Sequence, residues 1–72
     1  MRLWLKEMRI QQGLYQSQVA KMAGITAQSF SYIELSERRP SVDVAKKIAK
    51  ALGFNWTRFF EDDPQPNETE AI

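Results

Sequence analysis

Residues 16–35, QSQVAKMAGITAQSFSYIEL, decide the fold. The first half of this stretch has one apolar face at helical spacing, formed by Val19, Ala20 and Ala23. Gly24 ends this segment, because glycine readily adopts the positive φ of a tight turn. Ala20 is small enough for a second helix to cross it closely. We therefore predict a helix over residues 16–23 followed by a sharp turn.

The second half of the stretch predicts another helix, over residues 27–35. Thr26 is a favourable N-cap for it, and Phe30 and Ile33 form an i, i+3 apolar pair on one face. The opposite face carries small and hydrogen-bonding groups, namely Ala27, Gln28, Ser31 and Tyr32. A rigid corner with such a face fits the major groove of double-stranded DNA. Together the two helices predict a helix-turn-helix, and the alternative is an ordinary helix pair in a small bundle.

Apolar periodicity predicts three further helices, over residues 3–12, 42–52 and 56–60. Leu5 and Met8 face the core in the first of these, and Trp4 packs at its edge. Ser41 caps the second helix and Asn55 caps the third. The apolar face of the second consists of Val42, Ala45, Ile48, Ala49 and Leu52. No β pattern is present, so the fold class is all-α.

The charge of the chain is unevenly distributed. Ten Lys and Arg residues lie within residues 1–60 against four acidic residues, whereas residues 61–72 hold five acidic residues and no basic one. We therefore predict a DNA-binding domain over residues 1–60 and a disordered acidic tail over residues 61–72. A basic body suits a polyanionic partner. The alternative, favoured for Lys21, Lys46 and Lys50, is that lysines merely solvate helix faces.

The composition excludes several function classes. The chain contains no cysteine and no histidine, which rules out disulfides, thiolate metal sites, the usual zinc sites and a histidine general base. The few carboxylates of residues 1–60 are scattered, so we expect neither an enzyme nor a cofactor. No apolar run approaches the ~20 residues of a membrane span, and the N-terminus becomes charged too early for a signal peptide. We expect a soluble cytoplasmic protein.

Residues 3–60 resemble the lambda-repressor-like, or Cro/C1-type (XRE), helix-turn-helix family. The motifs that carry the resemblance are Leu5–Arg9 with Gly13, Leu14 and Gln16; Val19 and Ala20 with Ala23–Thr26; Phe30 with Ile33 and Glu34; Arg38 with Pro40 and Ser41; and Ile48–Gly53. The resemblance implies a compact five-helix bundle of the lambda-repressor-like type. It also implies a transcriptional regulator, most often a repressor, that binds palindromic operators as a homodimer.

The resemblance also implies which residues contact DNA. The implied base contacts are Ala27, Gln28, Ser31 and Tyr32. Gln28 suits a bidentate contact to adenine, Ala27 a thymine methyl group, and Tyr32 is otherwise an exposed surface aromatic. The implied phosphate contacts are Gln16, Ser29, Arg38 and Arg39. Arg9 and Glu34 match positions that often form a buried ion pair between the first and third helices.

Three residues depart from the family pattern. Tyr15 replaces the usual Ser or Thr cap of the second helix, so a cap worth ~1 kcal/mol is expected to be missing. Ser36 replaces a common glycine after the third helix, so the backbone there is expected to be strained or to turn differently. Leu35 is apolar where polar residues are usual, and it contacts either the DNA backbone or another protein.

The aromatic residues near the end of the domain allow a second function. Trp56, Phe59 and Phe60 either complete the core or contribute to a dimer contact. An alternative to the regulator is an antitoxin-like or anti-regulator module that binds a protein partner through helix 56–60 and the acidic tail.

Overall fold

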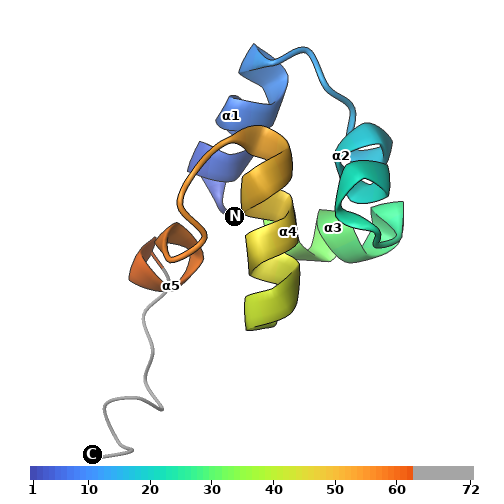
Figure 1. The fold of residues 1–72 in the computed structure, drawn as a ribbon. Coiled ribbons are helices and arrows are strands. Elements are labelled where there is room, and N and C mark those ends of the chain that lie inside the picture. Colours follow the sequence, from blue (N-terminus) through green and yellow to red (C-terminus); the bar gives the residue numbers. More distant parts are fainter. Residues whose placement is uncertain (63–72) are drawn as a thin grey trace, which may run out of the picture.

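The computed structural model describes residues 1–62, which form five helices and no strand (Figure 1). The helices are α1 (Leu3–Gln11), α2 (Gln16–Ala23), α3 (Ala27–Glu34), α4 (Val42–Leu52) and α5 (Arg58–Asp62). α2 packs against both α3 and α4, and α1 contacts α3. In Figure 1, α5 lies on the side of α4 opposite to α2 and α3. The predicted all-α fold is confirmed, whereas residues 63–72 of the predicted tail lie outside the described residues.

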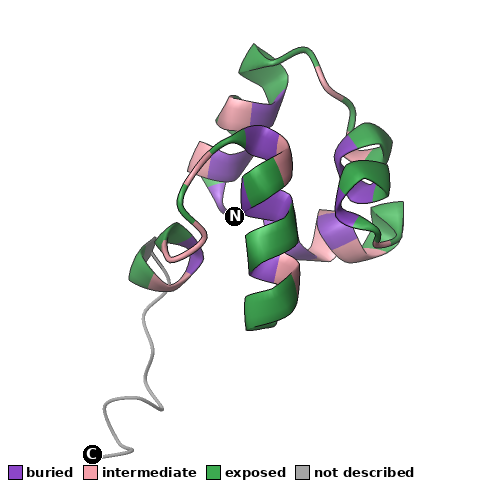
Figure 2. Ribbon diagram, viewed as in Figure 1, coloured by how far each residue is buried: buried purple, intermediate pink, exposed green. Residues whose placement is uncertain are grey.

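The core is built from the inward faces of all five helices, as the buried positions in Figure 2 show. Its fully buried members include Leu5 of α1, Val19 of α2, Phe30 of α3, Ile48 of α4 and Phe59 of α5. Burying one such side chain stabilises the fold by about 1.5–3 kcal/mol. Small residues of α2 and α4 let the backbones of neighbouring helices approach, namely Ala20, Ala23, Ala45 and Ala49.

The predicted helix ends are confirmed for α2 and α4, where the local signals are strongest. Ser41 Oγ accepts a hydrogen bond from the Val44 N–H at 3.2 Å and begins α4. Gly24 and Gly53 follow the last residues of the two helices with φ values of 73° and 85°. Tyr15 forms no side-chain cap, as expected. Instead the Gln18 side chain accepts a hydrogen bond of 2.7 Å from the Tyr15 N–H.

Val42 is the one member of the predicted apolar face of α4 that the structure contradicts. Its exposed fraction is 49%, because it lies in the first turn of α4, which faces solvent in Figure 2. Val44 packs against the core instead. Periodicity alone places Val42 on the buried stripe but does not reveal where the neighbouring helices stop covering it.

The predicted bounds of the last helix, residues 56–60, are also wrong. The helix begins at Arg58 rather than Trp56 and continues through Asp62, so Glu61 and Asp62 belong to a helix and not to the tail. Asn55 does not cap it directly: its Oδ1 accepts hydrogen bonds from the Thr57 N–H at 3.0 Å and the Thr57 hydroxyl at 2.8 Å. The Asn55 carbonyl also accepts a hydrogen bond from the Arg58 N–H at 3.0 Å, so this side-chain turn leads into α5. None of the helices within residues 1–62 is long and apolar enough to cross a membrane.

Candidate nucleic-acid interface

The outward face of α3 is polar because its inward face is fixed by two buried apolar residues. Thr26 Oγ1 accepts a hydrogen bond from the Ser29 N–H at 3.0 Å and starts the helix. Phe30 and Ile33 are then turned into the core. Of the residues predicted to contact bases, Ala27 and Gln28 are exposed, and the other two, Ser31 and Tyr32, are half-buried. The structure therefore brings all four to the accessible part of one helix.

Gln28 and Tyr32 are in contact on this face. The Gln28 Nε2 donates a hydrogen bond to the Tyr32 hydroxyl at 3.0 Å, across one turn of α3. The guanidinium carbon of Arg38 lies 5.1 Å from the centroid of the Tyr32 ring, within cation–π range. Arg38, predicted as a phosphate contact, is thus held against the helix that carries the polar face.

Ser36 makes the turn that brings Arg38 back to α3. Its φ is 64°, and it is the only residue other than glycine with a positive φ among those described. After this turn the backbone N–H groups of Glu37 and Arg38 donate to the Tyr32 carbonyl at 2.9 and 3.2 Å. The predicted strain at Ser36 is present, and the turn places Arg38 rather than displacing it.

Replacing Ser36 with glycine is expected to raise the free energy of unfolding by about 0.5–1 kcal/mol, because a left-handed conformation costs a side-chain-bearing residue more than it costs glycine. Urea denaturation measures the change. Gly53→Ser is the reverse control: it introduces the same residue at a φ of 85° with no atom near the added Cβ, and we expect it to destabilise by a similar amount. If Ser36→Gly were less stable than the wild type, the inference that the backbone is strained at Ser36 would be contradicted.

Gln16 and Ser29, both predicted to contact phosphates, already have protein partners. Gln16 is half-buried at the start of α2, and its Nε2 donates to Glu34 Oε1 at 2.7 Å. Ser29 Oγ accepts a hydrogen bond of 2.9 Å from the Thr26 hydroxyl. The amide of Gln16 has a second N–H, and the first N–H groups of a helix have no intrahelical acceptor. These N–H groups are therefore available for an additional acceptor. Arg39 is exposed on the loop after α3.

Glu34 is also the partner of Arg9, as the resemblance implied. Arg9 Nε donates to Glu34 Oε2 at 2.8 Å, and Arg9 Nη2 donates to Oε1 at 3.2 Å. The exposed fraction of Glu34 is only 1%. One buried carboxylate therefore joins α1, the start of α2 and the end of α3.

Arg2 is a structural residue that the sequence analysis missed. It is buried, and its Nη1 donates to the carbonyls of Ile33 and, at 3.4 Å, Arg38. Its backbone N–H donates to the Glu34 carbonyl at 2.8 Å, and its guanidinium lies over the Phe59 ring. The Ile33 and Glu34 carbonyls lie at the C-terminus of α3, where a positive charge interacts favourably with the helix dipole. No sequence signal distinguishes this arginine from a solvated one, because its acceptors lie more than thirty residues away in the chain.

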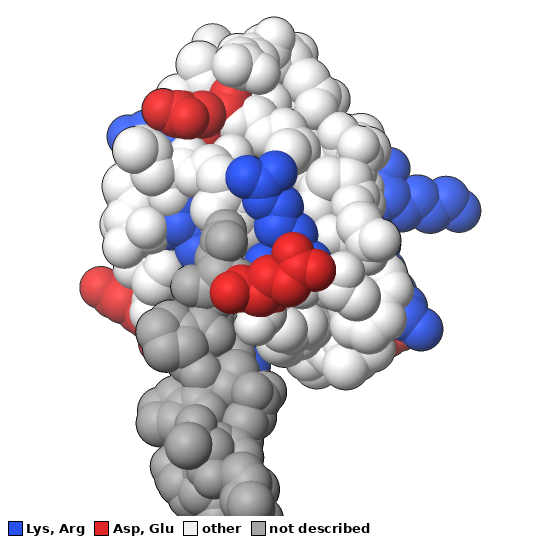
Figure 3. Space-filling view, turned by 90° about the vertical axis from the view of Figure 1, so that its left-hand side faces the viewer, with Lys and Arg blue, Asp and Glu red and all other residues white. Residues whose placement is uncertain are grey.

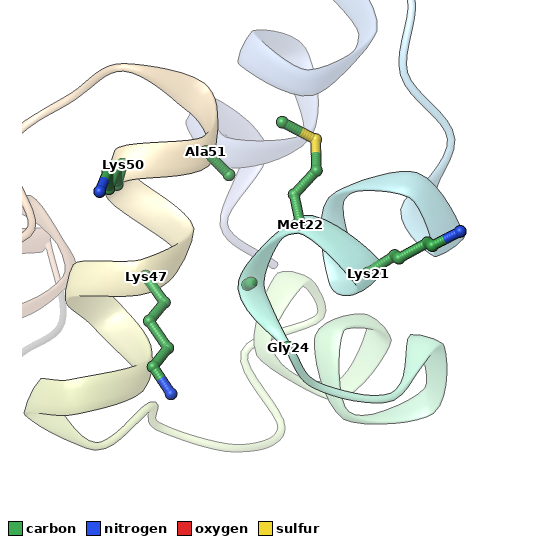
Figure 4. A pocket seen from close by; sticks show the side chains of 7 residues that line it. Lys21, Met22, Gly24, Lys47, Lys50 and Ala51 are labelled. Carbon is green, nitrogen blue, oxygen red and sulfur yellow. The ribbon is translucent and has the colours of Figure 1, made fainter.

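Three other features of the surface formed by residues 1–62 are relevant to a binding site. On the face that carries α1 and α5, basic and acidic side chains are interspersed (Figure 3). An open groove of about 530 Å³ lies between α2 and α4, with Met22, Lys47 and Lys50 among the residues that line it (Figure 4). Within residues 1–62, no group of three or more acidic side chains could hold a metal ion.

The comparisons with known proteins agree with this geometry. A helix-turn-helix family model matches residues 5–59, which is most of the chain. The chain belongs to the Cro/C1-type helix-turn-helix family. The resemblance of the sequence to this family is thereby confirmed, and DNA-binding transcriptional regulation is the function class of the family.

The chain is similar to several proteins that are named HTH-type transcriptional regulators. It is 52% identical over 62 residues to YqaF of Bacillus subtilis (strain 168), named an HTH-type transcriptional regulator, with 86% of this chain and 82% of YqaF covered. It is 32% identical over 68 residues to the HTH-type transcriptional regulator PuuR of Escherichia coli (strain K12), covering 94% of this chain but only 37% of PuuR. A regulator from Methanothermobacter thermautotrophicus is 38% identical over 53 residues, covering 74% of this chain and 77% of that protein. No solved structure matches at the same level of significance.

Proposed function

We propose that this helix-turn-helix protein is a repressor that places α3 in the major groove of a palindromic operator. The observation that carries the proposal is the accessible polar face of α3, with Gln28 exposed opposite the buried Phe30 and Ile33. A bound operator that overlaps a promoter excludes the polymerase. The relatives named as transcriptional regulators support this function class.

The proposed contacts divide into two kinds. Ala27, Gln28, Ser31 and Tyr32 lie against base edges, with Gln28 directed at an adenine. Gln16, Ser29, Arg38 and Arg39 hold phosphates and fix the position of α3 without reading the sequence. Arg9 and Glu34 contribute only through the fold.

Gln28→Ala is expected to weaken binding to the selected operator by ~1–3 kcal/mol and to remove the preference at one base position. Selection of bound duplexes from a random pool at fixed salt identifies the operator first, and titrations then measure the loss. Arg39→Ala is the matched control, and it is expected to weaken binding to all duplexes alike. It is also expected to reduce the slope of the logarithm of the binding constant against the logarithm of the salt concentration by about one. Equal effects of the two variants across the panel would contradict the division into base and phosphate contacts.

The proposal includes a homodimer, since a palindromic site matches a two-fold protein and sets two α3 helices about one DNA turn, ~34 Å, apart. Trp56 and Phe60 support a dimer contact made by α5 and the turn before it. Both are only half-buried, and their ring centroids lie 6.0 Å apart. Leu35, Ile10 and Met22 are further exposed apolar residues. A palindromic sequence in the selected operator would support the homodimer, and a single asymmetric site would contradict it.

The second candidate function is a protein-interaction module that uses α5 and the acidic tail. It is favoured by the half-buried Phe60 of α5 and the half-buried Trp56 just before it, which lie close in the chain to the run of acidic residues that starts at Glu61. Deleting residues 63–72, which leaves α5 complete, separates the two functions. Unchanged operator affinity with lost partner binding supports the module, whereas tighter DNA binding indicates that the tail only competes with phosphates.

A further inference from the structure

The amide of Gln28 does not stand alone on the DNA-facing surface of α3. Its Nε2 donates to the Tyr32 hydroxyl at 3.0 Å, and the two residues lie one helical turn apart. A free glutamine amide can turn about its last side-chain bond and exchange its donor and acceptor sides. In the structure the bond to Tyr32 holds this amide against one turn of α3 before any DNA is bound, with its nitrogen toward the hydroxyl.

Tyr32 is itself held in place from the protein side. The Arg38 guanidinium lies over its ring at 5.1 Å, and the N–H groups of Glu37 and Arg38 donate to its carbonyl. The Arg38 carbonyl in turn accepts a hydrogen bond from the buried Arg2. A continuous series of contacts therefore runs from the interior to the exposed Gln28 amide.

The chemistry of adenine fits the groups that this arrangement leaves available. In the major groove adenine presents the N7 acceptor and the N6 amino donor. A bidentate contact to it uses the amide oxygen of glutamine and one of the two amide N–H groups. The Tyr32 hydroxyl needs only one amide N–H, so the amide oxygen and the second N–H stay available for adenine while the side chain is held in place.

We propose that Tyr32 is a positioning residue that orients Gln28, and that the preference for adenine at the base pair facing Gln28 depends on the Tyr32 hydroxyl. This inference rests on the proposed function and changes the part of Tyr32 from base contact to support of a base contact. The ring alone is insufficient, because it is the oxygen that accepts the hydrogen bond from Gln28.

Tyr32→Phe tests the proposal, since it removes the hydroxyl and keeps the ring against Arg38. The affinities of wild type, Tyr32→Phe, Gln28→Ala and the double variant are measured at one salt concentration for the selected operator and for duplexes with each single-base change. We expect Tyr32→Phe to reduce the discrimination at the Gln28 base pair by about three- to tenfold, the range of one hydrogen bond. In the Gln28→Ala background the same change is expected to have no further effect.

Tyr15→Phe is the matched control, because Tyr15 is a 75% exposed tyrosine that precedes α2 and is not part of α3. We expect it to leave the discrimination unchanged, and urea denaturation checks that all variants are folded. Full discrimination in Tyr32→Phe would overturn the inference, as would an effect that persists without Gln28, since Tyr32 would then read a base itself. If the wild type shows no preference among duplexes, the proposed function fails as well, so the two failures are distinguishable.

Discussion

Arg9→Ala is expected to lower the free energy of unfolding by about 3 kcal/mol or more, because it leaves the buried Glu34 carboxylate without its cation. Two hydrogen bonds of 2.8 and 3.2 Å join the arginine to this carboxylate. The Gln16 amide remains as a partner, but a single neutral donor does not replace a charged one. A domain of this size has a total stability of only about 5 kcal/mol, so the variant is expected to retain about 2 kcal/mol or less.

The exposed ion pair of α4 provides the control for Arg9→Ala. Lys47 Nζ lies 3.2 Å from Asp43 Oδ2, but the side chains are 54% and 76% exposed. We expect Lys47→Ala to cost less than about 0.5 kcal/mol. The double variant Arg9→Met with Glu34→Leu is expected to recover most of the stability, because apolar side chains can replace a buried pair. A loss below about half a kcal/mol in Arg9→Ala would contradict the role of the pair.

Phe59→Ala is expected to destabilise the protein by about 3–5 kcal/mol, as in other deletions of a buried aromatic side chain. Phe59 is fully buried, and its ring centroid lies 5.3 Å from that of Trp4 and 5.5 Å from that of Phe54. α5 has only five residues, so its own hydrogen bonds cannot hold it against the bundle. Urea denaturation followed by tryptophan fluorescence measures the stability, and Trp4 and Trp56 both contribute to the signal.

Phe60→Ala is the neighbouring control for this second prediction. Phe60 is half-buried and packs edge-to-face with Trp56. We therefore expect roughly half the loss seen for Phe59 or less, since less apolar area returns to water. Equal losses in the two variants would show that α5 is not anchored mainly by Phe59.

The parts of the fold that could be predicted are those whose signals lie close together in the chain. α2 and α4 have an apolar stripe that ends at a glycine, and α4 also begins at a serine cap, so their bounds follow from local chemistry. The last helix was misplaced because Asn55 supports either a cap or a side-chain turn, and only packing decides between them. Val42 was misplaced because exposure at a helix end depends on neighbours distant in sequence.

The candidate site was predicted as a set of residues but not as a set of contacts. The polar face of α3 follows from the positions of Phe30 and Ile33 alone. The bond from Gln28 to Tyr32 and the return of Arg38 over the ring depend on rotamers and on the turn at Ser36. The buried position of Arg2 depends on carbonyl groups at the far end of α3, which no local pattern reveals.

The shared carboxylate of Glu34 has a consequence for efforts to modify this protein. The same two oxygens hold the bundle together through Arg9 and orient the amide at the start of α2 through Gln16. In the proposed complex with DNA, substitutions at these three positions that raise thermal stability therefore also alter the contact of Gln16 with the nucleic-acid backbone.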